Sequence, residues 1–136
     1  MGKRQESNKQ VVRDYVAAFN RGDLQALEGL FAPDAEIQGV LGRGQMQKVL
    51  PIWRELVNGL GMQLEVEAMA AEADVVAVRY TERGTHRAPF FGHAPTGRSY
   101  ELVAMEWFEI RDGRILRRWG ARDSAAQARQ IGMPLE

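Results

Sequence analysis

The sequence predicts a single α+β domain in which helices pack on one face of an antiparallel sheet. Apolar residues recur at helical spacing through about residues 8–60, and from residue 62 the hydrophobic period changes to two. A chain of 136 residues suits one hydrophobic core, since two cores would each be small. Helices that precede a run of strands favour an α+β arrangement. A long twisted sheet covered by helices curls, so we expect it to enclose a mainly apolar pocket.

The composition narrows the classes of function. Lys+Arg and Asp+Glu number 18 each, so the formal net charge is zero. The chain therefore lacks the positive charge that is typical of nucleic-acid-binding proteins, and no nucleic-acid partner is expected. The chain has no cysteine and two well-separated histidines, so neither a thiolate nucleophile nor a metal site is expected. No signal-peptide core or membrane-spanning run is seen, which predicts a soluble, cytoplasmic protein without a membrane partner.

The first predicted element is a helix. Ser7 begins a capping-box pattern, and Gly22 is placed to end the helix that follows. We therefore place the domain at residues 7–132 and expect residues 1–6 and 133–136 to be flexible termini.

Two further helices are predicted before the sheet. Asp23 can cap a short second helix, which Pro33 would end. A brief strand is expected at residues 36–40. The third helix is predicted over residues 46–60, and Pro51 inside it predicts a kink or a break.

The second half of the chain predicts four strands and a short helix, at residues 62–70, 75–85, 100–111, 114–123 and 124–132. In the first of these strands the even-numbered residues from Met62 to Ala70 would share one face. Asp112-Gly113 predicts a tight hairpin because such turns need positive φ angles. The connection at residues 87–98 reads as a long irregular loop at the rim of the pocket.

Glu106 is the most informative residue for function. It shares one face of its strand with Tyr100, Leu102, Ala104, Phe108 and Ile110. A carboxylate in such a row is costly unless it is hydrogen-bonded, paired or protonated, so Glu106 is a candidate acid or base inside the pocket. Two alternatives remain: this face is the solvent-exposed one, since the opposite row is also partly apolar, or Glu106 is a buried structural acid.

Asp123 and His86 are two further candidates. Asp123 follows Trp119 and Ala121 on one face of the last strand and could project into the mouth of the pocket; equally, it could cap the terminal helix. His86 ends a strand where the rim loop begins and could carry protons near neutral pH, or be a hydrogen-bonded structural histidine.

Several aromatic residues could line the pocket and bind a substrate, and for each of them ordinary core packing is the alternative. They are Tyr15, Phe19, Trp53, Tyr80 and Trp119. The arginines at positions 111, 114, 117, 118 and 122 are interpreted as a solvated face that discourages strand pairing.

A series of short motifs runs through the second half of the chain. They are Gly84-Thr85-His86, Phe91-Gly92, Pro95-Thr96-Gly97-Arg98, Asp112-Gly113-Arg114-Ile115 and Gln130-Ile131-Gly132. Together with Ala18-Phe19-Asn20 near the N-terminus, they resemble the SnoaL-like polyketide cyclases over nearly the whole chain.

This resemblance implies the nuclear-transport-factor-2-like, or cystatin-like, cone: N-terminal helices packed on a strongly curved antiparallel sheet, described as an α+β barrel and often dimeric. It implies a cavity for a small apolar ligand. It also implies intramolecular aldol chemistry without cofactor or metal, using an aspartate as acid–base and a nearby histidine. In our alignment the position of that aspartate is Gly120, and the position of the histidine is Glu106. His86 matches a family histidine and Asp123 a second aspartate.

The expected function is therefore cofactor-independent acid–base chemistry on a small hydrophobic carbonyl compound, by a cyclase, isomerase or lyase that forms a homodimer. Glu106 would act as acid or base, with His86 or Asp123 orienting the substrate. The alternative is a non-catalytic small-molecule-binding or dimerisation domain, favoured by the glycine at position 120.

Overall fold

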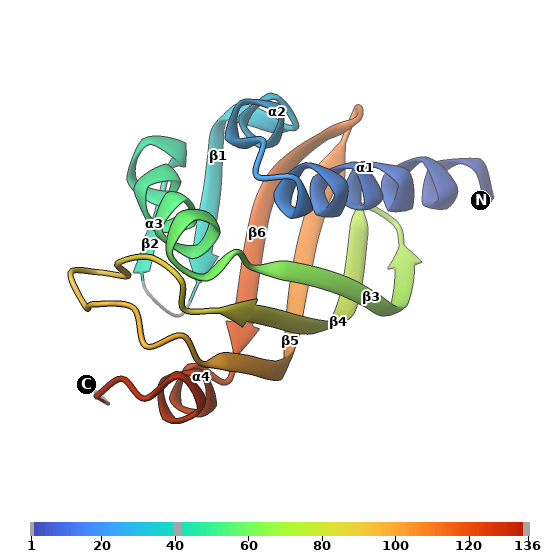
Figure 1. Ribbon diagram of the computed structural model, residues 1–136. Coiled ribbons are helices and arrows are strands. Elements are labelled where there is room, and N and C mark those ends of the chain that lie inside the picture. The colour runs from blue at the N-terminus through green and yellow to red at the C-terminus, as the bar shows by residue number, and fades with distance from the viewer. Residues whose placement is uncertain (1, 40–41, 135–136) are drawn as a thin grey trace.

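The computed structural model describes residues 2–39 and 42–134, which form a six-stranded sheet with helices on one face (Figure 1). The elements in chain order are α1 (Gly2–Asn20), α2 (Leu24–Gly29), β1 (Phe31–Gly39), β2 (Gly42–Gly44), α3 (Met46–Leu60), β3 (Gln63–Glu72), β4 (Val75–Thr85), β5 (Ser99–Arg111), β6 (Arg114–Arg122) and α4 (Ser124–Ile131). The predicted α+β class is confirmed. Within the described ranges, no helix is long and apolar enough to span a membrane.

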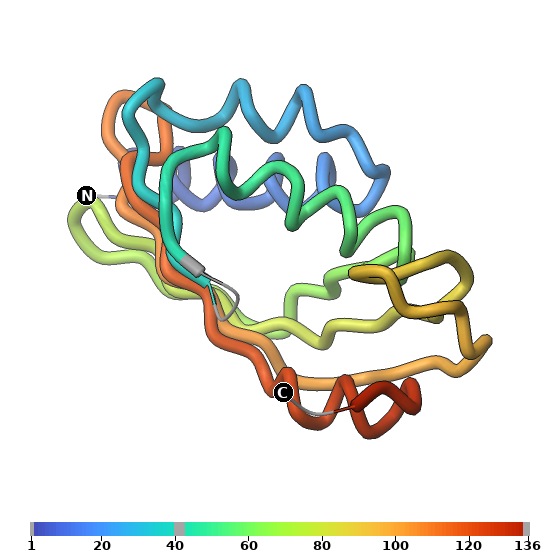
Figure 2. The backbone as a smooth tube through the Cα atoms, turned by 90° about the vertical axis from the view of Figure 1, so that its left-hand side faces the viewer, coloured from blue at the N-terminus to red at the C-terminus, as the bar shows by residue number. Residues whose placement is uncertain are grey.

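The sheet has the strand order β2-β1-β6-β5-β4-β3 and is mixed. β1 runs parallel to β6, whereas the other neighbouring strands are antiparallel, so the expectation of a purely antiparallel sheet was wrong at this one pair. The sheet bends around the helices (Figure 2) but does not close, because β2 and β3 remain at opposite edges. It is therefore an open cone rather than a barrel.

The N-terminal helices differ from prediction in their limits. α1 begins at Gly2, so Ser7 lies inside the helix instead of capping it. Asp23 does cap α2, since its side chain accepts a hydrogen bond from the Ala26 N–H. α3 continues without interruption through Pro51, so the break considered there does not occur.

β1 begins earlier than predicted. It starts at Phe31 and includes Pro33, which was expected to end a helix. The pairing of β1 with β6 shifts register between Phe31 and Glu36. This irregularity accommodates a residue that has no N–H to donate to a ladder. The predicted end of the strand at position 40 lies outside the described residues.

Turn chemistry at the C-terminal end agrees with the sequence. Asp112 and Gly113 have φ angles of 53° and 77°, as the predicted tight hairpin requires. Asp123 caps α4 through the Ala126 N–H at 2.9 Å, and Gly132 ends this helix in the left-handed region with φ 79°.

Two irregularities change which side chains face the helices. In β3 the register shifts between Val66 and Ala68, so the predicted single row from Met62 to Ala70 holds only for its first part. In β6 the neighbouring pairs are Ile110 with Ile115 and Glu109 with Arg117, which leaves one extra residue, Leu116, in the strand. A bulge of this kind reverses the facing of the residues that follow.

The hydrophobic core fills the space between α1, α3 and the concave face of the sheet. Its centre is a group of aromatic rings in edge or tilted contact, formed by Tyr15, Phe19, Phe31, Trp53 and Phe108. These contacts fix the distance between the helices and the sheet beside the cavity described next.

Candidate active site

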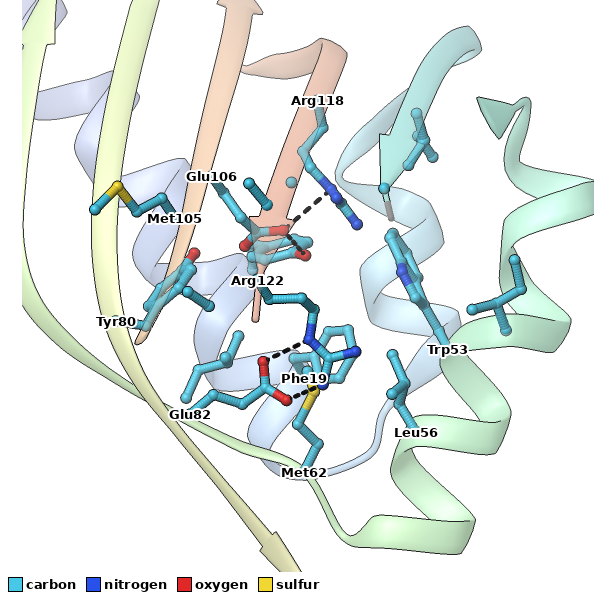
Figure 3. A pocket seen from close by; sticks show the side chains of 18 of the residues that line it. Phe19, Trp53, Leu56, Met62, Tyr80, Glu82, Met105, Glu106, Arg118 and Arg122 are labelled. Carbon is cyan, nitrogen blue, oxygen red and sulfur yellow. Dashed lines mark hydrogen bonds and ion pairs between the residues drawn. The ribbon is translucent and has the colours of Figure 1, made fainter. Parts of the chain in front are cut away.

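A cavity of about 70 Å³ lies between α1, α3 and the concave face of the sheet (Figure 3). One water needs roughly 10–15 Å³ on this scale, so the cavity has room for several waters or a small organic group. Its walls are mostly apolar, but four charged side chains also line it: Glu82, Glu106, Arg118 and Arg122.

Glu106 projects into this cavity from the middle of β5, and the predicted row of partners on its face is buried. Its Oε2 accepts a hydrogen bond from the Tyr15 hydroxyl at 3.0 Å and lies 3.1 Å from Arg118 Nε. Its Oε1 is buried and has no hydrogen-bond partner among the described residues. One carboxylate oxygen is therefore held in place, while the other keeps its lone pairs available.

Arg118 corrects the interpretation of the arginines as a solvated face. Its side chain is 7% exposed, and the Leu116 bulge turns it toward the helices. The guanidinium donates from Nη1 to the Gln38 carbonyl at 3.2 Å and lies 5.5 Å from the centre of the Trp53 ring. Burial disfavours the charge and is the largest single effect, but Glu106, Tyr15 and Tyr80 together outweigh it and raise the pKa of Arg118.

Gly120 is opposite Glu106 in the sheet and leaves space for this guanidinium. A Cβ atom at position 120 would overlap Arg118 Nη1 and come within 3.5 Å of Glu106 Oε2. The position where the alignment expected an acidic side chain is thus filled by a basic side chain from two residues earlier in the same strand.

Two tyrosines lie beside Glu106 as neutral hydroxyl donors. Burial, and then the charge of Glu106, raise the pKa of both Tyr15 and Tyr80 well above 10. Tyr15 uses its hydroxyl proton on Glu106. The buried Tyr80 hydroxyl has no partner among the described residues, although Tyr80 lines the cavity. This hydroxyl is therefore a neutral donor next to the Glu106 carboxylate.

A second ion pair lies further along the same wall (Figure 3). Arg122 donates from Nε to Glu82 Oε1 at 3.0 Å and from Nη2 to Glu82 Oε2. The Tyr100 hydroxyl donates to Glu82 Oε2 at 2.6 Å. The expectation of a solvated side chain was therefore wrong for Arg122 too, since it is only 12% exposed.

The sequence analysis did not single out Glu82 and misplaced both arginines. Glu82 could have been found, because it continues the alternating row of Val76, Val78 and Tyr80 on β4. The arginines could not, because a strict period of two places Ile115, Trp119 and Ala121 on one face. Only the bulge moves positions 118 and 122 inward.

The aromatic candidates separate into two groups. Tyr15, Phe19, Trp53 and Tyr80 line the cavity, as predicted. Trp119 instead lies on the opposite face of the sheet, 38% exposed, next to its strand partner Trp107. The reason is again the reversal of facing after Leu116.

Asp123 and His86 are not among the described residues that line the cavity, although Asp123 directly follows Arg122, which does. Asp123 is the N-cap of α4, one of the two roles considered for it. His86 is fully buried, and its Nδ1 accepts a hydrogen bond from the Thr96 N–H at 3.3 Å. This contact ties the rim loop to the end of β4.

Among the residues that the structure describes, no group of three or more His, Asp or Glu side chains is placed to hold a metal ion. The charged groups of the cavity form two separate acid–arginine pairs. The arrangement suits proton transfer within an apolar space: one carboxylate oxygen without a hydrogen-bond partner, one phenol beside it and a positive charge that holds the carboxylate in place.

Comparisons with known proteins identify the family and the fold of the chain. The family of SnoaL-like polyketide cyclases matches residues 9–131. IdmH, a candidate polyketide cyclase from Streptomyces antibioticus, has 30% identity and a TM-score of 0.80 over 93% of this chain and 99% of that chain. AclR, a candidate hydroxylase from Streptomyces galilaeus, has 26% identity and a TM-score of 0.86 over 96% and 99% of the two chains. A candidate polyketide cyclase from Xanthomonas campestris has 22% identity and a TM-score of 0.84 over 93% and 98%, which shows a shared fold.

The fold and site define an α+β cone with an apolar cavity that contains a buried acid. The match over residues 9–131 assigns the chain to the SnoaL-like polyketide cyclase family, as the sequence motifs indicated.

Proposed function

We propose that this protein catalyses cofactor-independent proton transfer on a small, hydrophobic, neutral carbonyl compound, with Glu106 as the base. The observation that carries the proposal is the free Oε1 of Glu106, buried in the cavity wall near the unpartnered hydroxyl of Tyr80. An unused acceptor and an unused donor inside an apolar cavity are a matched pair for a carbon acid and its carbonyl oxygen.

In the proposed reaction, Glu106 Oε1 takes a proton from the carbon next to a carbonyl group. The electron pair of the broken C–H bond moves onto the carbonyl oxygen, and the Tyr80 hydroxyl donates a hydrogen bond to the resulting enolate. Arg118 and Tyr15 hold Oε2, so Oε1 stays oriented toward the substrate. The enolate then attacks a second carbonyl carbon in a cyclisation, or receives the proton back at another carbon in an isomerisation.

The relatives support the cyclisation branch, since IdmH is described as a candidate polyketide cyclase. The acid–base residue would nevertheless sit on a different strand from the aspartate implied by the family alignment. In this chain the carboxylate comes from β5 at position 106, while position 120 on β6 is a glycine. Because these two positions are paired neighbours, both arrangements would present an acid to the same part of the cavity.

The competing hypothesis is a binding module without catalysis. It is favoured by the pairing of every charged group in the cavity, which could stabilise the fold alone. A thermal-shift screen of neutral aromatic and terpenoid carbonyl compounds, followed by turnover assays on the ligands found, separates the two hypotheses. Catalysis predicts turnover that Glu106→Gln abolishes while binding persists.

The matched control is Glu109→Gln on the same strand, since Glu109 pairs with the exposed Arg117. Turnover that survives in the Glu106→Gln protein would reject Glu106 as the base. Binding without turnover across the whole panel would favour the binding module.

We also propose that the protein forms a homodimer through the outer face of the sheet. Four of the six exposed large hydrophobic residues of the described chain lie there: Val103, Met105, Trp107 and Trp119. The face carries charges of both signs beside these residues, and the chain has no net charge, so a second copy would meet no overall repulsion. Sedimentation should show a dimer that Trp107→Glu dissociates; a monomeric parent protein would contradict the proposal.

A further inference from the structure

The second ion pair of the cavity has an unused donor. Arg122 lines the cavity, and its Nε and Nη2 are both bound to Glu82. Its Nη1 has no hydrogen-bond partner among the residues that the structure describes. In Figure 3 the guanidinium extends from Glu82 toward the wall formed by Trp53 and Leu56. A charged N–H group facing an apolar cavity is available to a ligand oxygen.

The position of this guanidinium is fixed before any ligand binds. Glu82 is 1% exposed and receives hydrogen bonds from both Arg122 and the Tyr100 hydroxyl. Because one edge of the planar guanidinium is held by both carboxylate oxygens, its orientation is also defined. A donor held in this way loses little conformational freedom when it binds a ligand.

Arg122 and Glu106 are separated along the sheet. Arg122 is paired with Ala104 in β5, two residues from Glu106. Two residues of a strand span about 7 Å, which is longer than a single functional group. A ligand that contacts both residues must therefore carry a reactive carbon at one end and an acceptor at the other.

The charges of the cavity indicate what kind of acceptor this is. Two arginines and two glutamates line the space, so their formal charges cancel. An added carboxylate would leave an uncompensated negative charge in a mostly apolar cavity, which is costly. A neutral carbonyl oxygen accepts the Nη1 hydrogen bond without that cost.

We infer that Arg122 is a specificity-determining residue that binds a second, neutral carbonyl oxygen of the substrate, at the end of the cavity away from Glu106. This inference rests on the proposed function, which assigns the reacting carbon of the substrate to the end of the cavity at Glu106. Two carbonyl oxygens of the substrate are then bound by different side chains. Tyr80 serves the carbonyl beside the reacting carbon, and Arg122 serves the distant one.

The test compares two probes that differ by one carbonyl group in place of a methylene: 1,4-cyclohexanedione and cyclohexanone. Isothermal titration calorimetry gives the ratio of their dissociation constants. A hydrogen bond from a charged donor predicts that the parent protein binds the dione about tenfold or more tightly. Arg122→Lys keeps a cation for Glu82 but removes the second guanidinium edge, and should bring this ratio close to one.

The matched control is Arg117→Lys, the same change at an exposed arginine of the same strand, which should leave the ratio unchanged. If Arg122→Lys does not fold, the double variant Glu82→Gln with Arg122→Met removes both charges and should also lose the preference. A parent protein without preference for the dione, a ratio unchanged by the Arg122 variants, or tighter binding of cyclohexanecarboxylate would each overturn the inference. The measurement needs no turnover, so it tests Arg122 separately from Glu106. The preference for the dione can be absent although Glu106 is the base, and it can be present although Glu106 is not the base.

Discussion

Replacement of Gly120 by alanine should disturb the Glu106–Arg118 pair directly. The new methyl group would overlap Arg118 Nη1, so the guanidinium must move away from its present position. That movement weakens the 3.2 Å hydrogen bond to the Gln38 carbonyl and the 3.1 Å contact with Glu106. A hydrogen bond from a charged donor contributes about 1.5–3 kcal/mol and the loss of a partner from a buried ion pair costs about 3–5 kcal/mol.

Because Arg118 is displaced rather than removed, only part of these contributions should be lost. We expect Gly120→Ala to lower the free energy of unfolding by about 2–4 kcal/mol, which lowers Tm by about 6–14 °C for a domain of this size. Urea unfolding followed by circular dichroism measures this change. Gly29→Ala is the matched control, since a methyl group at position 29 has nothing within 4 Å.

A double-mutant cycle isolates the cause. In a background that carries Arg118→Met and Glu106→Gln, no guanidinium occupies the space beside position 120, so Gly120→Ala should cost little. The reasoning is refuted if Gly120→Ala costs no more than Gly29→Ala in the parent protein. It is equally refuted if the full cost persists in the background without Arg118.

Three further predictions concern neighbouring groups. Tyr80→Phe should change the free energy of unfolding by less than about 1 kcal/mol, because the hydroxyl has no hydrogen-bond partner to lose. The same change should reduce turnover by about 10²-fold or more in steady-state assays. Unchanged turnover would show that Tyr80 has no part in the mechanism. Asp123→Ala should lower the free energy of unfolding by about 1 kcal/mol through loss of the α4 cap, and ligand affinity measured by calorimetry should not change. A large loss of affinity would show that Asp123 belongs to the ligand site. Burial raises the pKa values of Tyr15, Tyr80 and Tyr100, which are the three tyrosines of the chain, so the unfolded chain releases these protons first as the pH rises above 10 and stability should decline there. Ultraviolet titration should show three tyrosines that ionise only on unfolding; a tyrosine that titrates normally in the folded protein would contradict this environment.

The sequence was sufficient for the fold class, the long strands and the central acid. Glu106 was identified because a charged residue interrupted an otherwise apolar row, and that signal depends only on regular alternation within β5. The hairpin at Asp112-Gly113 and the cap at Asp23 were also predictable, because each depends on the local chemistry of one or two residues.

The partners of Glu106 were not predictable in the same way. A single extra residue, Leu116, decides whether Arg118 and Arg122 face the cavity or the solvent. The residue types in that segment do not indicate the bulge. The function of Gly120 depends on Arg118, since the glycine is needed only once a guanidinium crosses it. Such features arise from tertiary packing, which a pattern along the chain does not contain.

Deuterium exchange measures the proposed proton transfer without requiring the natural substrate. The purified protein is incubated in D₂O with cyclohexanone, and incorporation of deuterium next to the carbonyl group is followed by NMR. The proposed role of Glu106 predicts exchange faster than in buffer, a loss of about 10²-fold or more in Glu106→Gln, and no loss in Glu109→Gln. Exchange by Glu106→Gln at the rate of the parent protein would contradict it.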